Sequence, residues 1–261
     1  MNTVIVPVDF TDASIKAAEY TSLLLKNRPG AEVLLYHMNT DDVEEITIPE
    51  KMEALKNDLT GKTNISVNTL IESGSDFVEE LEKLCRHRNA SMVVMGVNEQ
   101  SGIISWFTSS NAIKMADTKA CPVLIIPPDA SFSRVENVML TSDFKDVHNT
   151  TPSGQIKNVL SLFNPKLHIV NVNSELYVSL SEDHEGEKEK LKEMFAEFNP
   201  QFYFLRLYDV DEAIKLFAND KNIDLIINVH REHSLLYRLF AGSHTKNLVY
   251  SSNIPVLSVH E

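Results

Sequence analysis

The sequence predicts two doubly wound α/β domains in tandem, each built on a five-stranded parallel sheet. Its 261 residues exceed the length of one average domain. Short apolar runs alternate with longer segments of helical period, which is the pattern of β-α-β units. The whole pattern also occurs twice, which indicates an internal duplication. With 43% hydrophobic and 23% charged residues, the chain has enough apolar side chains to form two cores.

The duplication is visible at both ends of each half. The apolar run Val4–Val8 leads into Asp9, and a similar run leads into Asp143, which lies 134 residues later. Near the end of each half, the run that starts at Cys121 returns at Ile254 with a spacing of 133 residues. We therefore expect three segments: a first domain over residues 1–127, a linker over 128–134 and a second domain over 135–261.

The elements of the first half follow from its hydrophobic periodicity. Expected strands are the continuous apolar runs Val4–Val8, Val33–His37, Ile65–Ile71, Met92–Met95 and Val123–Ile126. Expected helices are Ala13–Lys26, Asp42–Asp58, Asp76–Arg88 and Asn111–Asp117. Thr11 or Asp12 is suited to cap the first helix. The second half should repeat this order, with Glu185–Phe198 as its charged second helix.

Composition excludes several classes of function. The net charge of −13 repels phosphate backbones and anionic lipid, so neither nucleic acid nor a membrane is expected as a partner. Two cysteines are too few for a disulfide framework or a four-cysteine zinc site. Neither a signal peptide nor an apolar run of about 18 residues is recognisable, so we expect a cytoplasmic protein.

Open parallel sheets bind ligands beyond the carboxyl ends of their strands, where the strand order reverses. At those places stand V-P-V-D-F over residues 6–10, L-Y-H over 35–37 and M-V-V-M-G over 92–96, and the half closes with C-P-V-L-I-I-P over 121–127. With these features the chain resembles a tandem universal stress protein, two UspA-type domains that cover essentially all of it. The resemblance implies an adenine nucleotide alpha hydrolase-like fold in each half.

The resemblance also implies a nucleotide site. Nucleotide-binding members carry G-x2-G-x9-G-[S/T] after strand four, where glycines let backbone N–H groups approach the phosphates. This chain departs from that motif, with Gly96, Glu99, Ser109 and Ser110 in the first half. The second half has Val229, Glu232, Gly242 and Ser243 at the same positions. A carboxylate about 4 Å from a phosphate charge costs on the order of 4 kcal/mol at an effective dielectric of about 20.

The binding residues implied by the resemblance lie mostly in the first half. Because branched Val229 stands where a glycine would admit ligand, the first domain is the better candidate. The implied ligand is ATP or AMP, and Mg²⁺ is expected only together with nucleotide. The implied residues are Pro7, Val8, Asp9, Met38, Met95, Gly96, Glu99, Ser109, Ser110, Asp143, Gly242 and Ser243. Helix capping or a turn is the competing interpretation of Asp9, Ser110 and Ser243.

Two classes of function remain open. The first is a stress-response binding protein with a degenerate adenine-nucleotide site, and the second is a nucleotide-independent scaffold for protein partners or another small ligand. An enzyme is the weaker class, because neither a G-x-S-x-G elbow nor a P-loop is present and no catalytic base for slow ATP hydrolysis can be named. Glu99→Gly discriminates the two, since it should strengthen ATP binding only if a nucleotide site exists.

Partners and metals complete the expectations. The last strands, Val123–Ile126 and Val256–Val259, would lie at sheet edges, so we predict that they pair and form an intramolecular pseudo-dimer. A homodimer is left open. The apolar stretches Ile103–Phe107 and Leu235–Phe240 are expected to pack internally, with partner binding as the alternative. No metal site is expected, because the spacing of His230, His233 and His244 does not ensure convergent ligands.

Overall fold

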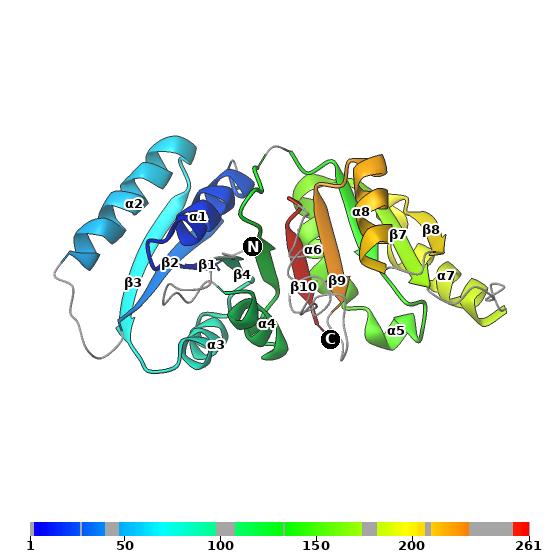
Figure 1. The fold of residues 1–261 in the computed structure, drawn as a ribbon, viewed down its shortest axis with the longest axis horizontal. Helices are drawn as coiled ribbons and strands as arrows, with labels where there is room; N and C mark the ends of the chain where they lie inside the picture. The colour runs from blue at the N-terminus through cyan, green and yellow to red at the C-terminus, as the bar shows by residue number, and fades with distance from the viewer. Residues whose placement is uncertain are drawn as a thin grey trace. The chain divides into compact units, whose positions relative to one another are not determined.

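A computed structural model describes residues 3–26, 28–39, 47–97, 108–132, 134–173, 182–206, 210–229 and 253–260. The chain divides into two compact units, Met1–Phe132 and Ser133–Glu261, called unit 1 and unit 2. The division falls within residues 128–134, the segment that we propose as the linker. In each unit, strands alternate with helices as the repeat predicts (Figure 1). No helix among the described residues is long and apolar enough to cross a membrane.

Unit 1 holds a parallel sheet in the order β3-β2-β1-β4-β5, so the strand order reverses between β1 and β4. Its strands are β1 (Thr3–Pro7), β2 (Glu32–Asn39), β3 (Ser66–Ser73), β4 (Met92–Gly96) and β5 (Val123–Ile126). Its helices are α1 (Asp12–Leu24), α2 (Ile48–Thr63), α3 (Phe77–Arg88) and α4 (Ser109–Asp117). The predicted fold class is confirmed, and the central strands are buried along nearly their whole length, as expected for a sheet covered on both faces.

The second helix of unit 1 differs from the expected Asp42–Asp58. Helix α2 runs over Ile48–Thr63, with a proline in its first turn, and residues 40–46 lie outside the described part of the chain. Met52, Leu55 and Leu59 are buried at helical spacing, so the apolar face continues past Asp58. The helix ends where Asn64 takes a left-handed conformation with φ 56°, a common C-cap.

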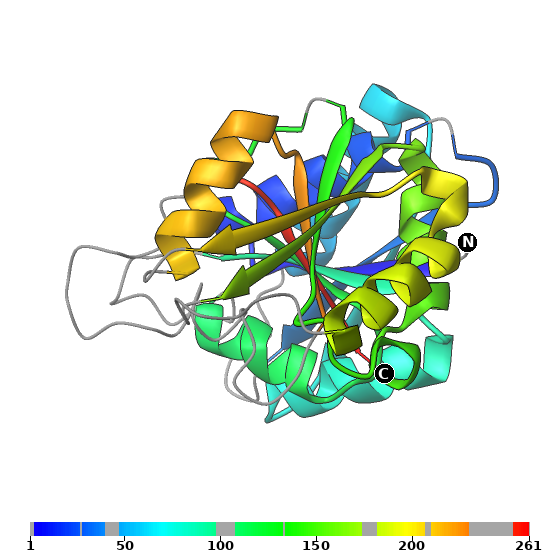
Figure 2. The ribbon, with the colours of Figure 1, turned by 90° about the vertical axis from the view of Figure 1, so that its right-hand side faces the viewer.

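Unit 2 repeats the sheet in the order β10-β9-β6-β7-β8. Its strands are β6 (Asn137–Thr141), β7 (Lys166–Asn173), β8 (Gln201–Arg206), β9 (Leu225–Val229) and β10 (Val256–Val259). Its helices are α5 (Val147–Thr150), α6 (Ser153–Phe163), α7 (Glu182–Met194) and α8 (Val210–Lys221), with a 3-10 turn over Ala196–Phe198. Helix α8 covers one face of this sheet, and α6 and α7 lie on the other (Figure 2).

The first helix of unit 2 is broken, whereas the repeat predicts one continuous helix like α1. Pro152 lacks a backbone N–H and crowds the residue before it, which pushes Thr151 to φ −108° and ψ 112°. The expected helix is therefore split into the four-residue α5 and the longer α6. At the carboxyl edge of the sheet, unit 2 therefore has the short helix α5 where unit 1 has the first turn of α1.

Candidate functional site

The turn after β1 carries Asp9, the first candidate residue. Asp9 Oδ1 accepts hydrogen bonds from Thr11 N at 3.0 Å and from Thr11 Oγ1 at 2.6 Å. Phe10, between them, has φ 62°, and Thr11 caps α1 by accepting from Ser14 N at 3.4 Å. Thr11 is thus the N-cap, as predicted, and one oxygen of Asp9 shapes the strand-end turn that precedes the helix.

Side chains from β2 support the same turn. Pro7 is the last residue of β1, and Val8 extends the strand because its N–H donates to Tyr36 O at 2.8 Å. Val8 O accepts from His37 Nδ1 at 2.7 Å, so the buried imidazole holds the end of β1 in place. Met38 follows with 1% of its side chain exposed. Residues of two neighbouring strands therefore converge at this carboxyl edge.

Gly96, at the end of β4, has a packing role. A Cβ atom at this position would lie 2.0 Å from Ala13 O and 2.6 Å from Ala13 C, far closer than atoms approach in proteins. Only glycine lets the first turn of α1 rest on the end of β4. Met95, beside it, is fully buried. The glycine that the resemblance assigns to phosphate binding is therefore needed for the contact between helix and sheet.

The start of α4 carries the two serines. Thr108 is the N-cap, and its Oγ1 accepts from Asn111 N at 3.2 Å. Ser109 and Ser110 are the first residues of the helix, and the Ser110 hydroxyl lies 2.8 Å from Thr108 Oγ1. The capping interpretation of Ser110 is therefore wrong, because Thr108 occupies that position one residue before the helix.

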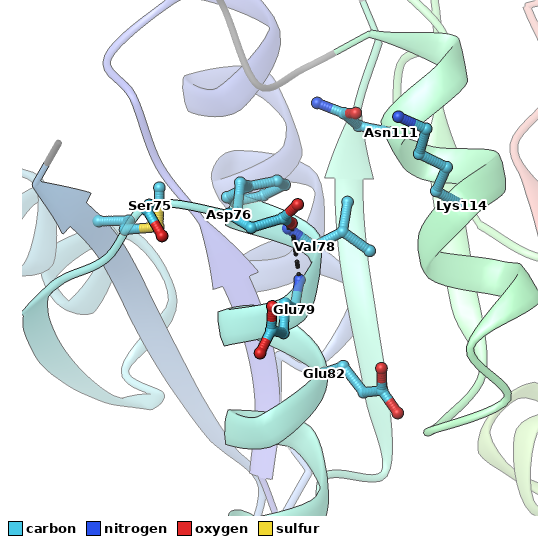
Figure 3. Close-up of a pocket in the computed structure, with 9 residues that line it drawn as sticks. Ser75, Asp76, Val78, Glu79, Glu82, Asn111 and Lys114 are labelled. Atoms are coloured by element: carbon cyan, nitrogen blue, oxygen red, sulfur yellow. Dashed lines mark hydrogen bonds between the residues drawn. The ribbon is translucent and has the colours of Figure 1, made fainter.

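A pocket of about 440 Å³ opens between the end of β2, the start of α3 and α4. Figure 3 shows Asn111 and Lys114 on α4 across from Asp76 and Val78 at the start of α3. Its described lining consists of Met38, Ser75, Asp76, Phe77, Val78, Glu79, Glu82, Asn111 and Lys114. The volume lies within the range of small-molecule sites, which span roughly 300–1,000 Å³.

The charges of this pocket are mostly negative. Asp76 Oδ1 accepts from Val78 N at 2.9 Å and Glu79 N at 3.0 Å, so this carboxylate already caps α3. Glu79 pairs with Lys83 at 2.7 Å and Glu82 pairs with Arg86 at 2.9 Å, both on the exposed helix surface where such pairs are weak. Lys114 is the one cation among the described lining residues. The described lining therefore contains apolar side chains, three carboxylates and one ammonium group.

Of the nine predicted residues that the structure describes, Met38 is the one that lines the pocket. Asp9, Gly96 and Ser110 lie at the same carboxyl edge. Asp9 and Ser110 contact the turn and the helix start to which they belong, and Gly96 lies against Ala13 of α1. Glu99, Gly242 and Ser243 lie outside the described residues, as do His230, His233 and His244. Among the described residues, no group of three or more His, Cys, Asp or Glu side chains could hold a metal ion.

Sequence reasoning missed the residues that follow β3. Gly74 lets this loop lie against β2, because a Cβ there would be 2.7 Å from Glu80 Cγ and 3.0 Å from Met38 Sδ. Asp76 then starts α3. The signal in the sequence is a glycine two residues before an aspartate that can cap a helix, at the carboxyl end of the third strand.

Unit 2 repeats the turn but closes the space around it. Asp143 Oδ1 accepts from Lys145 N at 3.1 Å, and Asn171 Nδ2 donates to Ser142 O at 2.9 Å, as His37 does to Val8 O in unit 1. Phe144 has φ 56°, like Phe10, yet its side chain is only 2% exposed. Its ring lies 5.2 Å from that of Phe204. Aromatic side chains of β8 thus cover the turn of unit 2.

A carboxylate also occupies the start of α5. Glu187 Oε2, from α7, accepts from Val147 N at 2.6 Å, and Glu187 Oε1 pairs with Lys190 at 2.6 Å. The Lys190 ammonium, together with the Val147 N–H, lowers the pKa of the Glu187 carboxyl below its ordinary value. An anionic side chain of the protein therefore lies where the turn of unit 2 offers a backbone donor.

Comparison with known proteins agrees with the fold and the repeat. The universal stress protein family matches residues 1–127 and 166–260, and the chain belongs to that family. The suspected tandem arrangement is confirmed, since both halves contain matched residues. No curated protein matches the sequence.

Two solved structures from bacteria and archaea show the same architecture at low sequence identity. A universal stress protein from Archaeoglobus fulgidus is 16% identical with a TM-score of 0.68, covering 99% of this chain and 98% of that one. A putative universal stress protein from Pseudomonas aeruginosa is 12% identical with a TM-score of 0.60, covering 100% and 93%. An Arabidopsis thaliana family member with AMP bound is 17% identical with a TM-score of 0.34, covering 49% of this chain and 92% of that one.

Proposed function

We propose that unit 1 is the ligand-binding half of a stress-response binding protein, and that its ligand is an adenine nucleotide. The observation that carries this proposal is the pocket of about 440 Å³ at the carboxyl edge of the unit 1 sheet. It lies beside β2, whose residue Met38 is among the binding residues that the family resemblance implies. We also propose a binding role and not a catalytic one, since Asp9 accepts a hydrogen bond from Thr11 N and Asp76 accepts one from Val78 N.

The lining favours a nucleotide with few phosphates. Met38, Phe77 and Val78 offer an apolar surface for a base, and Ser75 and Asn111 offer hydrogen-bonding groups for the sugar. Lys114 can pair with one phosphate, whereas each further phosphate charge meets the carboxylates of Asp76, Glu79 and Glu82. We therefore expect AMP to bind more tightly than ATP, and Mg²⁺ to reduce the difference by bridging carboxylate and phosphate.

Unit 2 has a structural role in this proposal. The buried Phe144 and the Glu187 carboxylate at the start of α5 leave its turn unsuited to an anionic ligand. Each chain would then hold one nucleotide site, in unit 1. We further propose that the last strands of the two units pair.

Calorimetric titration of the full chain with AMP and with ATP, with and without Mg²⁺, tests this function. A single site per chain with AMP tighter than ATP is expected. Lys114→Glu should weaken AMP binding about 10-fold or more, because an attraction becomes a repulsion. Lys62→Glu is the matched control, since Lys62 is an exposed cation on α2 outside the pocket. Equal affinity of both variants, or two sites per chain, would contradict the proposal.

The acidic lining supports a second candidate, a nucleotide-independent scaffold. Asp76, Glu79 and Glu82 would repel nucleotide and suit a partner with basic groups. Absence of binding heat and of a thermal shift at millimolar AMP and ATP would favour this candidate. Glu79→Gln should then leave nucleotide behaviour unchanged, whereas at a weak nucleotide site it should strengthen ATP binding.

A further inference from the structure

The two cysteines of the chain meet inside unit 1. Cys85 lies in the last turn of α3, and Cys121 lies two residues before β5. Their residues are 1% and 3% exposed, and their thiols hydrogen-bond to each other. Only two cysteines occur in 261 residues, and the fold brings both to one buried contact.

The backbone on either side of this contact is held independently. Cys85 O accepts from Ala90 N at 2.9 Å at the end of α3. Pro122 O, beside Cys121, accepts from Val93 N of β4 at 2.9 Å. Arg86 Nη2 donates to Thr118 O at 3.1 Å and so joins the end of α3 to the end of α4. Bond formation would bring the two sulfur atoms from hydrogen-bond contact to about 2.05 Å.

We propose that Cys85 and Cys121 form a reversible dithiol–disulfide site, oxidised by a hydroperoxide and reduced by a small thiol. One thiolate attacks the peroxide, the O–O bond breaks, and sulfenic acid and water (or an alcohol) result. The second thiol then attacks the sulfenic sulfur, the S–S bond forms and a second water leaves. Two thiols lose two electrons and two protons in total, and the peroxide accepts them. Thiol–disulfide exchange reverses the step.

Burial of the two thiols should make their oxidation slow. The hydrogen-bonded Cys121 thiol and burial both raise the pKa of the Cys85 thiol above its ordinary value. The attacking thiolate is therefore scarce at neutral pH, and the hydroperoxide must reach the site through local opening. Oxidation should be slow compared with that of an exposed thiol, and it should become faster as the pH rises.

The disulfide would join the last turn of α3 to the segment between α4 and β5. Asp76 caps the other end of α3, and both Asp76 and Lys114 of α4 line the pocket. The closed loop spans residues 85–121 and includes β4 and α4. Closing a loop of this length restricts the unfolded chain, so unit 1 should melt about 10 °C higher when oxidised. This inference does not depend on nucleotide binding.

The test treats the full chain with hydrogen peroxide at pH 7 and pH 8.5, followed by unfolding and alkylation of the remaining thiols. We expect the loss of both thiols together, a mass lower by about 2 Da, and one peptide linking Cys85 to Cys121 under non-reducing conditions. The thermal transition should rise with oxidation and return with dithiothreitol. Cys85→Ala and Cys121→Ala are the matched controls, because alanine is tolerated in apolar cores and each leaves one thiol without a partner.

Several results would overturn the proposal. They are two alkylatable thiols after prolonged peroxide at pH 8.5, a disulfide between chains, and sulfinic acid at either residue without a cross-link. If either alanine variant fails to fold, the wild-type chain decides the question by itself through the mass, the linked peptide and the reversible thermal shift.

Discussion

The two units share one turn and use it differently. In both units an aspartate follows the first strand, and the next residue is a phenylalanine with positive φ. In both units a side chain of the second strand, β2 or β7, donates a hydrogen bond to the backbone carbonyl of the residue before this aspartate. In unit 1 the phenylalanine, Phe10, is half-buried beside His37, whereas Phe144 of unit 2 is buried. A duplicated turn therefore stays near a pocket in one copy and is covered in the other.

The units also differ in the contact between the first helix and the end of the fourth strand. In unit 1, Ala13 and Gly96 are small, and α1 lies close to β4. The corresponding residues of unit 2 are Val147 and Val229, and neither α5 nor α6 approaches β9 as closely. Larger side chains on both sides, together with the break at Pro152, keep the helix away from the strand. In unit 1, the small residues Ala13 and Gly96 together allow the first helix to rest on the end of the fourth strand.

The largest expected effect comes from exchanging these residues. Gly96→Val should cost more than about 4 kcal/mol or prevent folding, because its Cβ would lie 2.0 Å from Ala13 O. Val229→Gly, the reciprocal change, should cost only about 1–2 kcal/mol, since Val229 is half-buried and at a strand end. Urea unfolding followed by circular dichroism measures both. A similar loss in the free energy of unfolding of both variants would contradict the difference between the two helix–strand contacts.

The second effect concerns the two phenylalanines. Phe144→Ala should destabilise unit 2 by about 3–5 kcal/mol, because a buried ring against Phe202 and Phe204 is lost. Phe10→Ala should cost roughly 1 kcal/mol, because its half-buried ring contacts His37 and the Lys51 ammonium. Differential scanning calorimetry of both variants gives the two losses. A larger loss for Phe10→Ala would reverse our assignment of the open and covered turns.

A third expected effect is that the stability of unit 2 depends on pH through a buried histidine. His168 of unit 2 is buried between Tyr203 and Phe217, at the position of Leu34 in unit 1. Burial lowers the pKa of His168 below its usual value near 6.5, and Lys221 and Lys166 add to this. The unfolded chain therefore takes up the proton first, so unit 2 loses stability as the pH falls below about 6.5.

His168→Leu tests that pH dependence. Between pH 7 and pH 5 the variant should lose less stability than the wild type does, because leucine takes up no proton on unfolding. The measurement is urea unfolding at the two pH values, with Leu34→Ala in unit 1 as a control that changes stability without adding pH dependence. A wild type and variant with parallel pH profiles would show that His168 does not titrate on unfolding.

The smallest effect is at Tyr36, whose counterpart in unit 2 is Val170. The Tyr36 hydroxyl is buried and has no hydrogen-bond partner among the described residues. Burial and the nearby carboxylates of Glu72 and Glu80 raise its pKa to about 12. Tyr36→Phe should be neutral or stabilising by up to about 1 kcal/mol, measured by urea unfolding. A loss above that would indicate a partner for the hydroxyl.

Much of the fold was predictable because it depends on local patterns. Continuous β-branched runs located the strands of unit 1, and the repeat indicated the second sheet. The end of α2 was misplaced because its polar surface hid the buried spacing of Met52, Leu55 and Leu59. The sequence Thr151-Pro152 favours a break before α6. The prediction for this segment rested on its repeat in α1, which has no proline, and so missed the break.

The site was less predictable, because its lining comes from segments that meet only in three dimensions. The rule about strand ends placed Asp9, Met38 and Gly96 at the correct edge. It could not reveal that Gly96 is needed for Ala13, since that role depends on a distance between helix and strand. Nor could it place Asp76, the cap of α3, and Lys114 of α4 in the lining of one pocket.

The central claim, that unit 1 alone binds ligand, is tested most directly by hydrogen–deuterium exchange with and without saturating AMP. The account predicts slower exchange at residues 74–79 and 109–114, which flank the pocket, and unchanged exchange at 142–147 and 201–206 in unit 2. Protection of the unit 2 segments, or unchanged exchange at 74–79 and 109–114 when calorimetry reports a saturated site, would contradict it.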